Sequence, residues 1–162
     1  MYNRFIAIDF ETATNDRNSA CALGIAVVEN LEIIDHDYFL IRPPKRNFVF
    51  TDVHGITWNQ VKNEATFDKL WPHIRKYFRK IDFIAAHNSA FDKSVMESCC
   101  NYYGLKPPKK KYRCTLELSR KKLNLEKNSL DVVCRYYSID LNHHNALSDT
   151  LACAKLMINF MK

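Results

Sequence analysis

The segment FIAIDFET, residues 5–12, constrains the fold most, because it is an apolar run that ends in two carboxylates. As a β-strand it alternates its side chains, so that Asp9 and Glu11 share one face with Phe5 and Ala7. The other face is wholly apolar and consists of Ile6, Ile8 and Phe10. Two carboxylates held close together and partly out of water repel each other unless a cation lies between them. The alternative is that both point into solvent at the end of the strand.

The remaining segments predict an α/β domain. Two β-rich runs that meet at Asn30 are typical of an antiparallel hairpin, and the prolines of RPPKRNF predict a loop after it. Apolar spacing predicts a helix over 67–81, although Pro72 suits only an early turn and would shift its start. Further along we expect a strand at 83–87, a helix from about Ser89, a break at 106–111, and helices over 115–122, 129–138 and 145–162. This order predicts a mixed sheet covered by helices.

Composition narrows the class of protein. The 162 residues fit one domain, 1–162, and no segment has the features of a secretory signal or the length of apolar sequence that a membrane helix requires. We therefore expect a cytoplasmic protein without membrane contact. Its six cysteines lack the spacing of a disulfide framework or a zinc site, which predicts reduced thiols in the core.

The net charge of +6 is concentrated in four segments. These are RPPKR (42–46), RKYFRK (75–80), KPPKKKYR (106–113) and RKK (120–122). Such runs are usual on solvated faces and are also typical of surfaces that bind nucleic acid. Charge alone does not decide between the two interpretations.

Acidic and imidazole groups stand at the ends of three expected elements. Asp9 and Glu11 end the first strand, Asp92 in HNSAFD opens the helix after the second buried run, and HHNALSDT holds His144 and Asp149. If Asn145 caps the last helix, His144 lies on the preceding loop and Asp149 in the first turn. Taken singly, an Asp in a first turn is usually a partner of the helix dipole. We expect His87 to make a structural hydrogen bond and His143 to face water.

The ordered set resembles the DEDDh branch of the DnaQ-like 3′–5′ exonucleases, which includes the epsilon subunit of bacterial DNA polymerase III. AIDFETA matches the first motif of that family, AAHNSAFD the second and HHNALSDTLACA the third. VHGIT (53–57) is similar to the loop between the first two motifs in the polymerase III type. The resemblance implies an RNase H-like exonuclease fold, α/β, with a mixed central β-sheet flanked by α-helices.

The resemblance also implies the chemistry of the site. Asp9, Glu11, Asp92 and Asp149 would hold two Mg²⁺ or Mn²⁺ ions, because oxygen-only ligands favour these metals. The ions would activate a water and stabilise the leaving 3′-oxygen, and His144 would act as general base. The backbone of Thr12 would contact the terminal 3′-hydroxyl, and Val53, His54 and Phe91 would flank the terminal base. For Val53 and Phe91, a place in the core is an equally good interpretation.

Several functions stay open at this point. The leading one is an exonuclease on single-stranded DNA that releases nucleoside 5′-monophosphates, with basic residues in 106–122 holding the upstream backbone. The alternatives are an RNA-directed enzyme of the oligoribonuclease or RNase T type, a proofreading subunit associated with DNA polymerase, and a binding module that no longer cuts. Because the chain stops at Lys162, without the tail that the family uses for polymerase binding, we expect a free-standing enzyme or a domain of a longer protein. The sequence does not indicate an oligomeric state.

Overall fold

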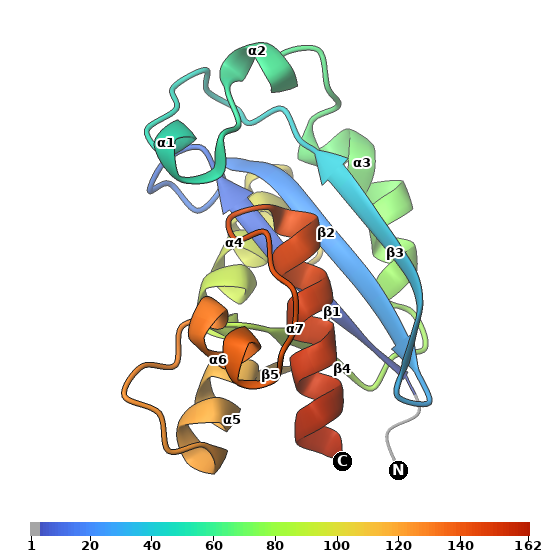
Figure 1. The fold of residues 1–162 in the computed structure, drawn as a ribbon. Coiled ribbons are helices and arrows are strands. Elements are labelled where there is room, and N and C mark those ends of the chain that lie inside the picture. Colours follow the sequence, from blue (N-terminus) through green and yellow to red (C-terminus); the bar gives the residue numbers. More distant parts are fainter. Residues whose placement is uncertain (1–3) are drawn as a thin grey trace.

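The computed structural model describes residues 4–162 and contains a mixed five-stranded sheet in the order β3-β2-β1-β4-β5 (Figure 1). β1 is antiparallel to β2, and β2 to β3, whereas β4 and β5 run parallel to β1. The strands are β1 Arg4–Thr12, β2 Ala20–Glu29, β3 Glu32–Leu40, β4 Phe83–Ala86 and β5 Lys111–Cys114. The mixed sheet confirms the predicted α/β class.

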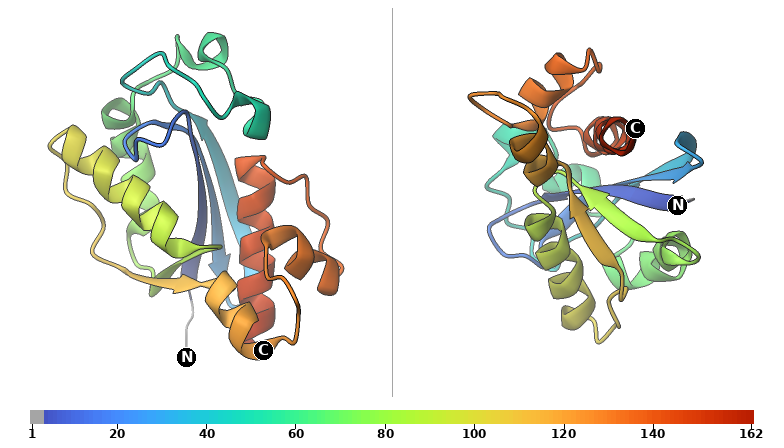
Figure 2. Two further views of the ribbon diagram at one scale, coloured as in Figure 1. Left: turned by 90° about the vertical axis from the view of Figure 1, so that its left-hand side faces the viewer. Right: turned by 90° about the horizontal axis from the view of Figure 1, so that it is seen from below.

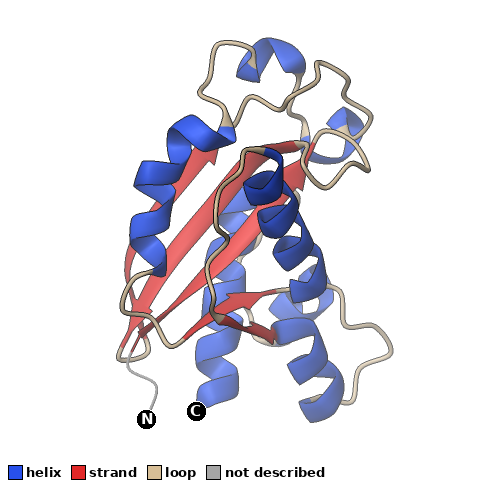
Figure 3. Cartoon of the chain, turned by 180° about the vertical axis from the view of Figure 1, so that it is seen from behind, coloured by secondary structure: helices blue, strands red, loops and turns tan. Residues whose placement is uncertain are grey.

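Helices cover both faces of this sheet (Figures 2 and 3). α3 and α4 pack on one face, and α7 packs on the other with α6 against it. The helices are α1 Thr51–His54, α2 Trp58–Val61, α3 Phe67–Ile74, α4 Ser89–Tyr102, α5 Thr115–Lys122, α6 Leu130–Tyr136 and α7 Ala146–Met161. In the described part of the chain, none of the helices has the combined length and hydrophobicity of a membrane span.

The two faces of β1 differ as the alternation predicts. Ile6, Ile8 and Phe10 belong to the apolar cluster that α3 and α4 complete. Phe5 and Ala7 face α7 instead, beside Cys153 and Met157. Asp9 and Glu11, which follow on this second face, therefore lie on the α7 side of the sheet.

The structure corrects several predicted boundaries. The helix expected over 67–81 ends at Ile74 and continues as a 3₁₀ helix, η1, over Arg75–Phe78. Pro72 lies inside α3 and does not shift its start, since the helix begins at Phe67. The region 51–61, which includes the whole expected VHGIT loop, holds the short helices α1 and α2, and the first two residues of that loop belong to α1.

A fifth strand is also absent from the sequence-based assignment. The break expected at 106–111 ends one residue into β5, whose Lys111–Cys114 pair with Phe83–Ala86 of β4.

The last helix, α7, buries more than one side, whereas its apolar spacing predicts a single stripe of Leu147, Leu151, Ala154, Ile158 and Met161. Leu156 and Phe160 pack toward α6, whereas Cys153 and Met157 pack on the sheet. All six cysteines are unpaired and buried, as expected for core thiols.

Candidate active site

Three carboxylates meet where the middle of β1 passes the first turn of α7. One carboxylate oxygen from each of Asp9, Glu11 and Asp149 lies within 4.8 Å of the other two. Asp149 is 4% exposed, and Asp9 and Glu11 are partly exposed. Residues far apart in the chain thus place their negative charges together, as the motif order predicts.

Asp92 approaches the same place from the other side of β1. It lies in the first turn of α4, is 1% exposed, and accepts a hydrogen bond from the backbone N–H of Phe10 at 2.9 Å. Its charge contributes to the raised pKa of Asp9, which shows that the two carboxyl groups interact. All four predicted acidic residues therefore converge around Asp9.

Gly24 allows α7 to approach the sheet closely enough to present Asp149. It pairs with Asp9 across the β1–β2 ladder and lies under the first turn of α7. A Cβ at this position would collide with the hydroxyl of Thr150 and the backbone carbonyl of Ala146. The absence of a side chain at Gly24 thus sets the distance between helix and strand. Sequence reasoning overlooked this residue, although a glycine inside an apolar strand is a signal of close backbone approach.

Burial disfavours the charged form of every carboxyl group in the cluster, and repulsion by the other carboxylates adds to this effect at Asp9 and Glu11. Burial raises the pKa of Asp9 well above its usual value, and the charges of Asp92, Asp149 and Glu11 raise it further. Burial, followed by the charge of Asp149, raises the pKa of Glu11 to about 8. Burial raises the pKa of Asp92 to about 7 although the Phe10 N–H opposes the shift, and burial also raises that of Asp149.

The donor set fits hard divalent cations. All four groups offer oxygen, which Mg²⁺ and Mn²⁺ prefer, and no thiolate belongs to the clusters of metal-ligand groups found among the described residues. A cation between the carboxylates would offset the repulsion that raises their pKa values. Asp9, Glu11 and Asp149 could therefore hold a cation together, with Asp92 able to contribute next to Asp9.

The loop before α7 arranges two adjacent histidines at this cluster. Asn145 caps α7, because its side chain accepts the N–H of Ser148 at 3.0 Å. His144 lies on the preceding loop with a positive φ of 64°, and its backbone N–H donates to Asp149 Oδ2 at 3.1 Å. Both placements agree with the prediction.

His143 does more than face water. Its ring Nδ1 lies 3.2 Å from Asp149 Oδ2, and its ring stacks on that of His144 with centroids 3.8 Å apart. Its side chain nevertheless keeps 36% of its exposure. His143 is thus exposed, as expected, and its ring also contacts Asp149, because the turn at His144 brings the preceding ring back onto that carboxylate.

A cavity of about 270 Å³ opens in front of the carboxylates. Asp9, Glu11 and Asp149 line it on one side together with His143 and His144. Its other wall comes from the start of α5 and the start of α6, through Leu116, Ser129 and Leu130. The carboxylates thus face a concave space.

His87 lines the same cavity, yet both its ring nitrogens are engaged in the protein. Nδ1 lies 2.9 Å from Thr115 Oγ1, and Nε2 lies 3.0 Å from the carbonyl oxygen of Asn128. Burial lowers the pKa of His87 to about 4. These bonds join the end of β4 to α5 and to the segment before α6, which confirms the expected structural role.

His54 joins α1 to the end of β1. Its Nδ1 accepts the backbone N–H of Ile56 at 3.1 Å, so the ring proton of the neutral form lies on Nε2. Nε2 then donates to the carbonyl oxygen of Thr12 at 3.0 Å. Burial lowers the pKa of His54, and the charge of His144 across the site lowers it further. Thr12 and His54, both predicted to contact substrate, thus form one hydrogen-bonded edge of the site.

The two apolar positions of the predicted substrate set differ. Val53 is 49% exposed, so its interpretation as a core residue is wrong. Phe91 is partly buried against the cluster on the α4 side, and the guanidinium of Arg17 lies 4.7 Å from its ring centroid. Phe91 therefore packs in the protein and also borders the site, directly before Asp92.

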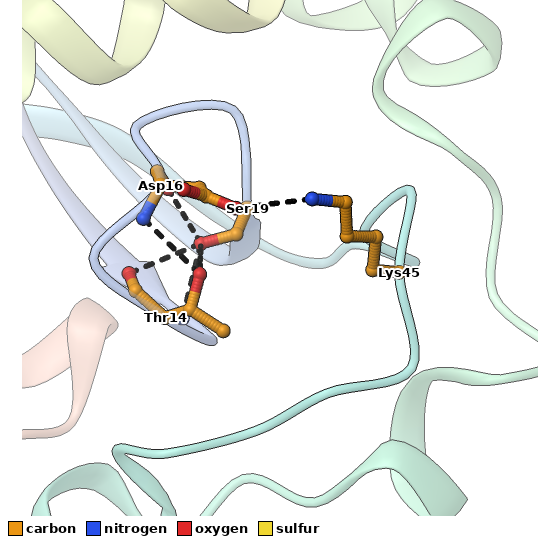
Figure 4. A network of polar contacts seen from close by, with 4 residues as sticks. All are labelled: Thr14, Asp16, Ser19 and Lys45. Carbon is orange, nitrogen blue, oxygen red and sulfur yellow. Dashed lines mark hydrogen bonds and ion pairs between the residues drawn. The ribbon is translucent and has the colours of Figure 1, made fainter.

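The loop between β1 and β2 is held by its own polar groups (Figure 4). The hydroxyl of Ser19 donates to the carbonyl oxygen of Asp16 at 2.6 Å and accepts the backbone N–H of Thr14 at 3.1 Å. The carboxylate of Asp16 in turn lies 3.4 Å from the ammonium of Lys45. These bonds hold the shape of the loop and connect it to the segment that contains Lys45.

Comparison with known proteins agrees with this geometry. Residues 6–157 match the family model named RNase_T and described as Exonuclease. The PolC-type DNA polymerase III of Staphylococcus aureus strain bovine RF122 is 27% identical over 164 residues, which cover 98% of this chain and 11% of the relative. The DNA polymerase III subunit epsilon of Buchnera aphidicola subsp. Baizongia pistaciae is 27% identical over 175 residues, which cover 96% of this chain and 69% of the relative. The chain thus spans about a tenth of the first relative and about two thirds of the second.

Solved structures share the fold. Exonuclease X in complex with 5′-overhanging duplex DNA has a TM-score of 0.79 and 22% identity, over 97% of this chain and 90% of that one. The nuclease domain of 3′hExo, a DEDDh family member bound to rAMP, has a TM-score of 0.81 and 19% identity, over 99% and 92%. The likeness confirms the RNase H-like fold predicted from the motifs. With nearly its whole length matched by the family model, this chain belongs to the RNase T exonuclease family.

Proposed function

We propose that residues 1–162 form one cytoplasmic exonuclease domain that hydrolyses the terminal phosphodiester of single-stranded DNA and releases nucleoside 5′-monophosphates. The observation that carries this proposal is the meeting of Asp9, Glu11 and Asp149 beside a cavity of about 270 Å³, with the charge of Asp92 contributing to the raised pKa of Asp9. A purely apolar pocket could bind a nucleotide, but unlike this cavity it would hold no group that can take part in activating water. Four acidic groups with raised pKa values are suited to divalent cations, on which this family depends.

The proposed ligands of two Mg²⁺ or Mn²⁺ ions are Asp9, Glu11, Asp92 and Asp149. When bound, such ions supply activation of water and neutralisation of the charge that develops on the phosphate. Asp9 occupies the centre of the four carboxyl groups, so we assign it to both ions. The hydrogen bond from Phe10 to Asp92 orients that carboxylate, and Gly24 sets the position of Asp149.

His144 is the proposed general base. Its backbone bond to Asp149 holds the loop at the mouth of the cavity, where a neutral imidazole ring can accept a proton from water. His143 is the positioning residue of this pair, because its ring contacts Asp149 and stacks on His144. Loss of the His143 ring should therefore disturb the site less than loss of the base.

The predicted substrate residues form the edge of the site that would receive the 3′ end. The backbone of Thr12 is proposed to contact the terminal 3′-hydroxyl, and the bond from His54 to the Thr12 carbonyl supports that backbone. Exposed Val53 and the ring of Phe91 are proposed to flank the terminal base. Such an end site would exclude a continuing chain or a 3′-phosphate.

DNA is favoured over RNA because VHGIT resembles the polymerase III type, and because the curated relatives reported above are DNA polymerase III proteins. The same relatives support a second candidate, in which the domain associates with a DNA polymerase for proofreading. Because one structural neighbour is bound to rAMP, the experiment below also tests the RNA-directed alternative.

The test compares 5′-labelled single-stranded DNA and RNA of one sequence, with a 3′-hydroxyl or a 3′-phosphate, in Mg²⁺, Mn²⁺ or EDTA. We expect a ladder that shortens from the 3′-hydroxyl end of DNA, no cutting in EDTA, and 5′-mononucleotides as products. Faster degradation of RNA would move the assignment to the RNA-directed type. Cutting of a circular single strand, or equal rates on the 3′-phosphate strand, would contradict an exonuclease that reads the 3′-hydroxyl.

A further inference from the structure

Arg17 lies on the loop between β1 and β2 and lines a groove beside α4. Its guanidinium covers the ring of Phe91 at 4.7 Å, and its backbone carbonyl accepts the thiol of Cys99 at 3.8 Å. Arg17 thus contacts the first turn of α4 with its side chain and the third with its backbone. A strand that leaves the terminal nucleotide site past Phe91 would meet this guanidinium next.

The groove beyond Arg17 has a volume of about 820 Å³ and lies between loop 15–18 and the last turns of α4. Lys45 and Tyr102 line it as well. Tyr102 is 56% exposed, and its ring is held edge-on by Tyr103 with centroids 4.9 Å apart. An exposed but fixed aromatic ring in a polar groove is the kind of platform on which single-stranded bases stack.

A basic pocket of about 460 Å³ lies beyond the end of α4. Its lining includes Gly104, which follows Tyr102 by two residues. Figure 3 shows the chain after α4 crossing this face of the molecule toward β5, opposite α3. Trp71 and Phe78 supply apolar walls. All its charged lining residues are cations: Arg75, Arg79, Lys106, Lys109 and Lys110.

The charges of the groove and the pocket complement a polyanion. Asp16 is the one acid among their described lining residues, and it pairs with Lys45 in an exposed contact that contributes little. Two lysines of 106–122 are bound within the protein: the ammonium of Lys110 donates to the carbonyl of Ile81, and that of Lys122 donates to the carbonyl of Phe160. Lys106 and Lys109 line the pocket, whereas Arg120 and Lys121 belong to the described lining of neither the pocket nor the groove.

We propose that the upstream part of a single strand leaves the active site past Phe91 and Arg17, stacks a base on Tyr102, and lays its backbone in the basic pocket. This inference rests on the proposed function, in which the 3′ end occupies the carboxylate site. From Phe91 to Tyr102, α4 rises about 16 Å. A strand of three nucleotides is therefore too short to reach the basic pocket, whereas twelve nucleotides reach it.

The test measures binding of 5′-fluorescein oligothymidylates of three and twelve nucleotides by anisotropy, in EDTA so that no turnover occurs. We expect the longer strand to bind at least tenfold more tightly. Tyr102→Ala should weaken its binding roughly 5- to 100-fold, the effect of losing one stacked base, whereas Tyr102→Phe should keep it. Lys106→Glu/Lys109→Glu should flatten the slope of log K against log salt by about 1.4, for two lost phosphate contacts. The matched control, Arg120→Glu/Lys121→Glu, changes the net charge equally and should leave the slope nearly unchanged.

Equal affinities for the two lengths, or equal effects of the two charge-reversal pairs, would overturn the proposed track. If the Lys106/Lys109 variant binds the long strand normally but loses a poly-glutamate peptide that the unmodified chain binds, the pocket takes an acidic protein segment instead. Turnover of the three-nucleotide strand in Mg²⁺ separates this inference from the proposed function. Variants at Tyr102, Lys106 and Lys109 should cut this short strand at the unmodified rate. A chain that cuts neither length but still binds the longer strand through Tyr102 would keep the proposed upstream binding site and lose the exonuclease assignment.

Discussion

The two faces of β1 carry side chains with opposite consequences for the folded protein. On one face Ile6, Ile8 and Phe10 are almost fully buried against α3 and α4, and each large side chain removed from water contributes about 1.5–3 kcal/mol to folding. On the other face the apolar run stops after Ala7, and Asp9 and Glu11 take positions that could have extended the core. There the same enclosure raises carboxyl pKa values. One face of the strand therefore stabilises the fold, and the other stores unfavourable electrostatic energy that a bound cation would offset.

The two faces of β1 should differ most in their effect on catalysis when a charge on the carboxylate face is removed. Asp9→Asn and Asp149→Asn should each reduce turnover of single-stranded DNA by roughly 10³–10⁶-fold, as expected for members of a cooperative catalytic unit. The fold should persist, because the amide keeps the shape and removes a repelling charge. Steady-state rates with excess Mg²⁺ measure the effect, and the exposed Asp140→Asn serves as control. Rates near those of the unmodified chain in either variant would show that these carboxylates bind no essential metal.

The next largest effect separates the two histidines above the carboxylates. His144→Ala should lower the single-turnover rate by roughly 10²–10⁴-fold, the usual contribution of a positioned general base, with metal affinity retained. His143→Ala should cost only about tenfold, because it removes one hydrogen bond to Asp149. Calorimetric titration with Mn²⁺ accompanies the rates. The reverse order of effects would assign the base to His143, and lost metal affinity in His144→Ala would make that residue a ligand.

On the apolar face the expected effect is on stability. Ile8→Ala should lower the free energy of unfolding by about 2–5 kcal/mol, because it leaves a cavity between β1 and the helices behind it. The rate per folded molecule should change little, since the side chain points away from the carboxylates. Urea unfolding measures this, and Ile34→Ala at a position that is 50% exposed should stay within about 0.5 kcal/mol. A large loss of activity at full folding would show that the two faces are coupled.

The smallest effect is the pH dependence of the metal-free chain. The pKa of Glu11 is about 8 in the folded protein, above the ordinary value for an unfolded glutamate. The folded state therefore binds the extra proton between about pH 4 and pH 8, and this group destabilises the chain increasingly as pH rises through that window.

Glu11→Gln removes this group, so in EDTA its melting temperature should exceed that of the unmodified chain by a margin that grows from pH 5 to pH 8. Saturating Mg²⁺ should reduce or reverse the margin, because only the unmodified site has every ligand. A margin that is the same at pH 5 and pH 8 would contradict a raised pKa at Glu11.

Much of the site could be predicted from the sequence because its residues stand at the ends of regular elements. Alternation fixed which face of β1 holds Asp9, and Asp92 and Asp149 each follow a recognisable helix start. The positions of these groups depend on local rules, and the fold brings them together.

What could not be predicted depends on close approach and on pairing between distant segments. Gly24 matters only once α7 lies on it, and His143 reaches Asp149 only because His144 adopts a positive φ. β5 carries one lysine and one arginine and follows two prolines, so its strand character comes from pairing with β4 and not from its own composition. The groove at Tyr102 likewise exists only where the loop 13–19 meets α4.

The central claim is that the carboxylate face of β1 is a two-cation site, and Mn²⁺ binding followed by electron paramagnetic resonance tests it most directly. The unmodified chain should bind two Mn²⁺ ions whose signals show mutual coupling, as expected for ions about 3.5–4 Å apart. Ile8→Ala should behave in the same way at a temperature where it is folded, and Asp9→Asn should lose the coupled pair. The account would be contradicted by an unmodified chain that binds no Mn²⁺, or by a coupled pair that survives in Asp9→Asn.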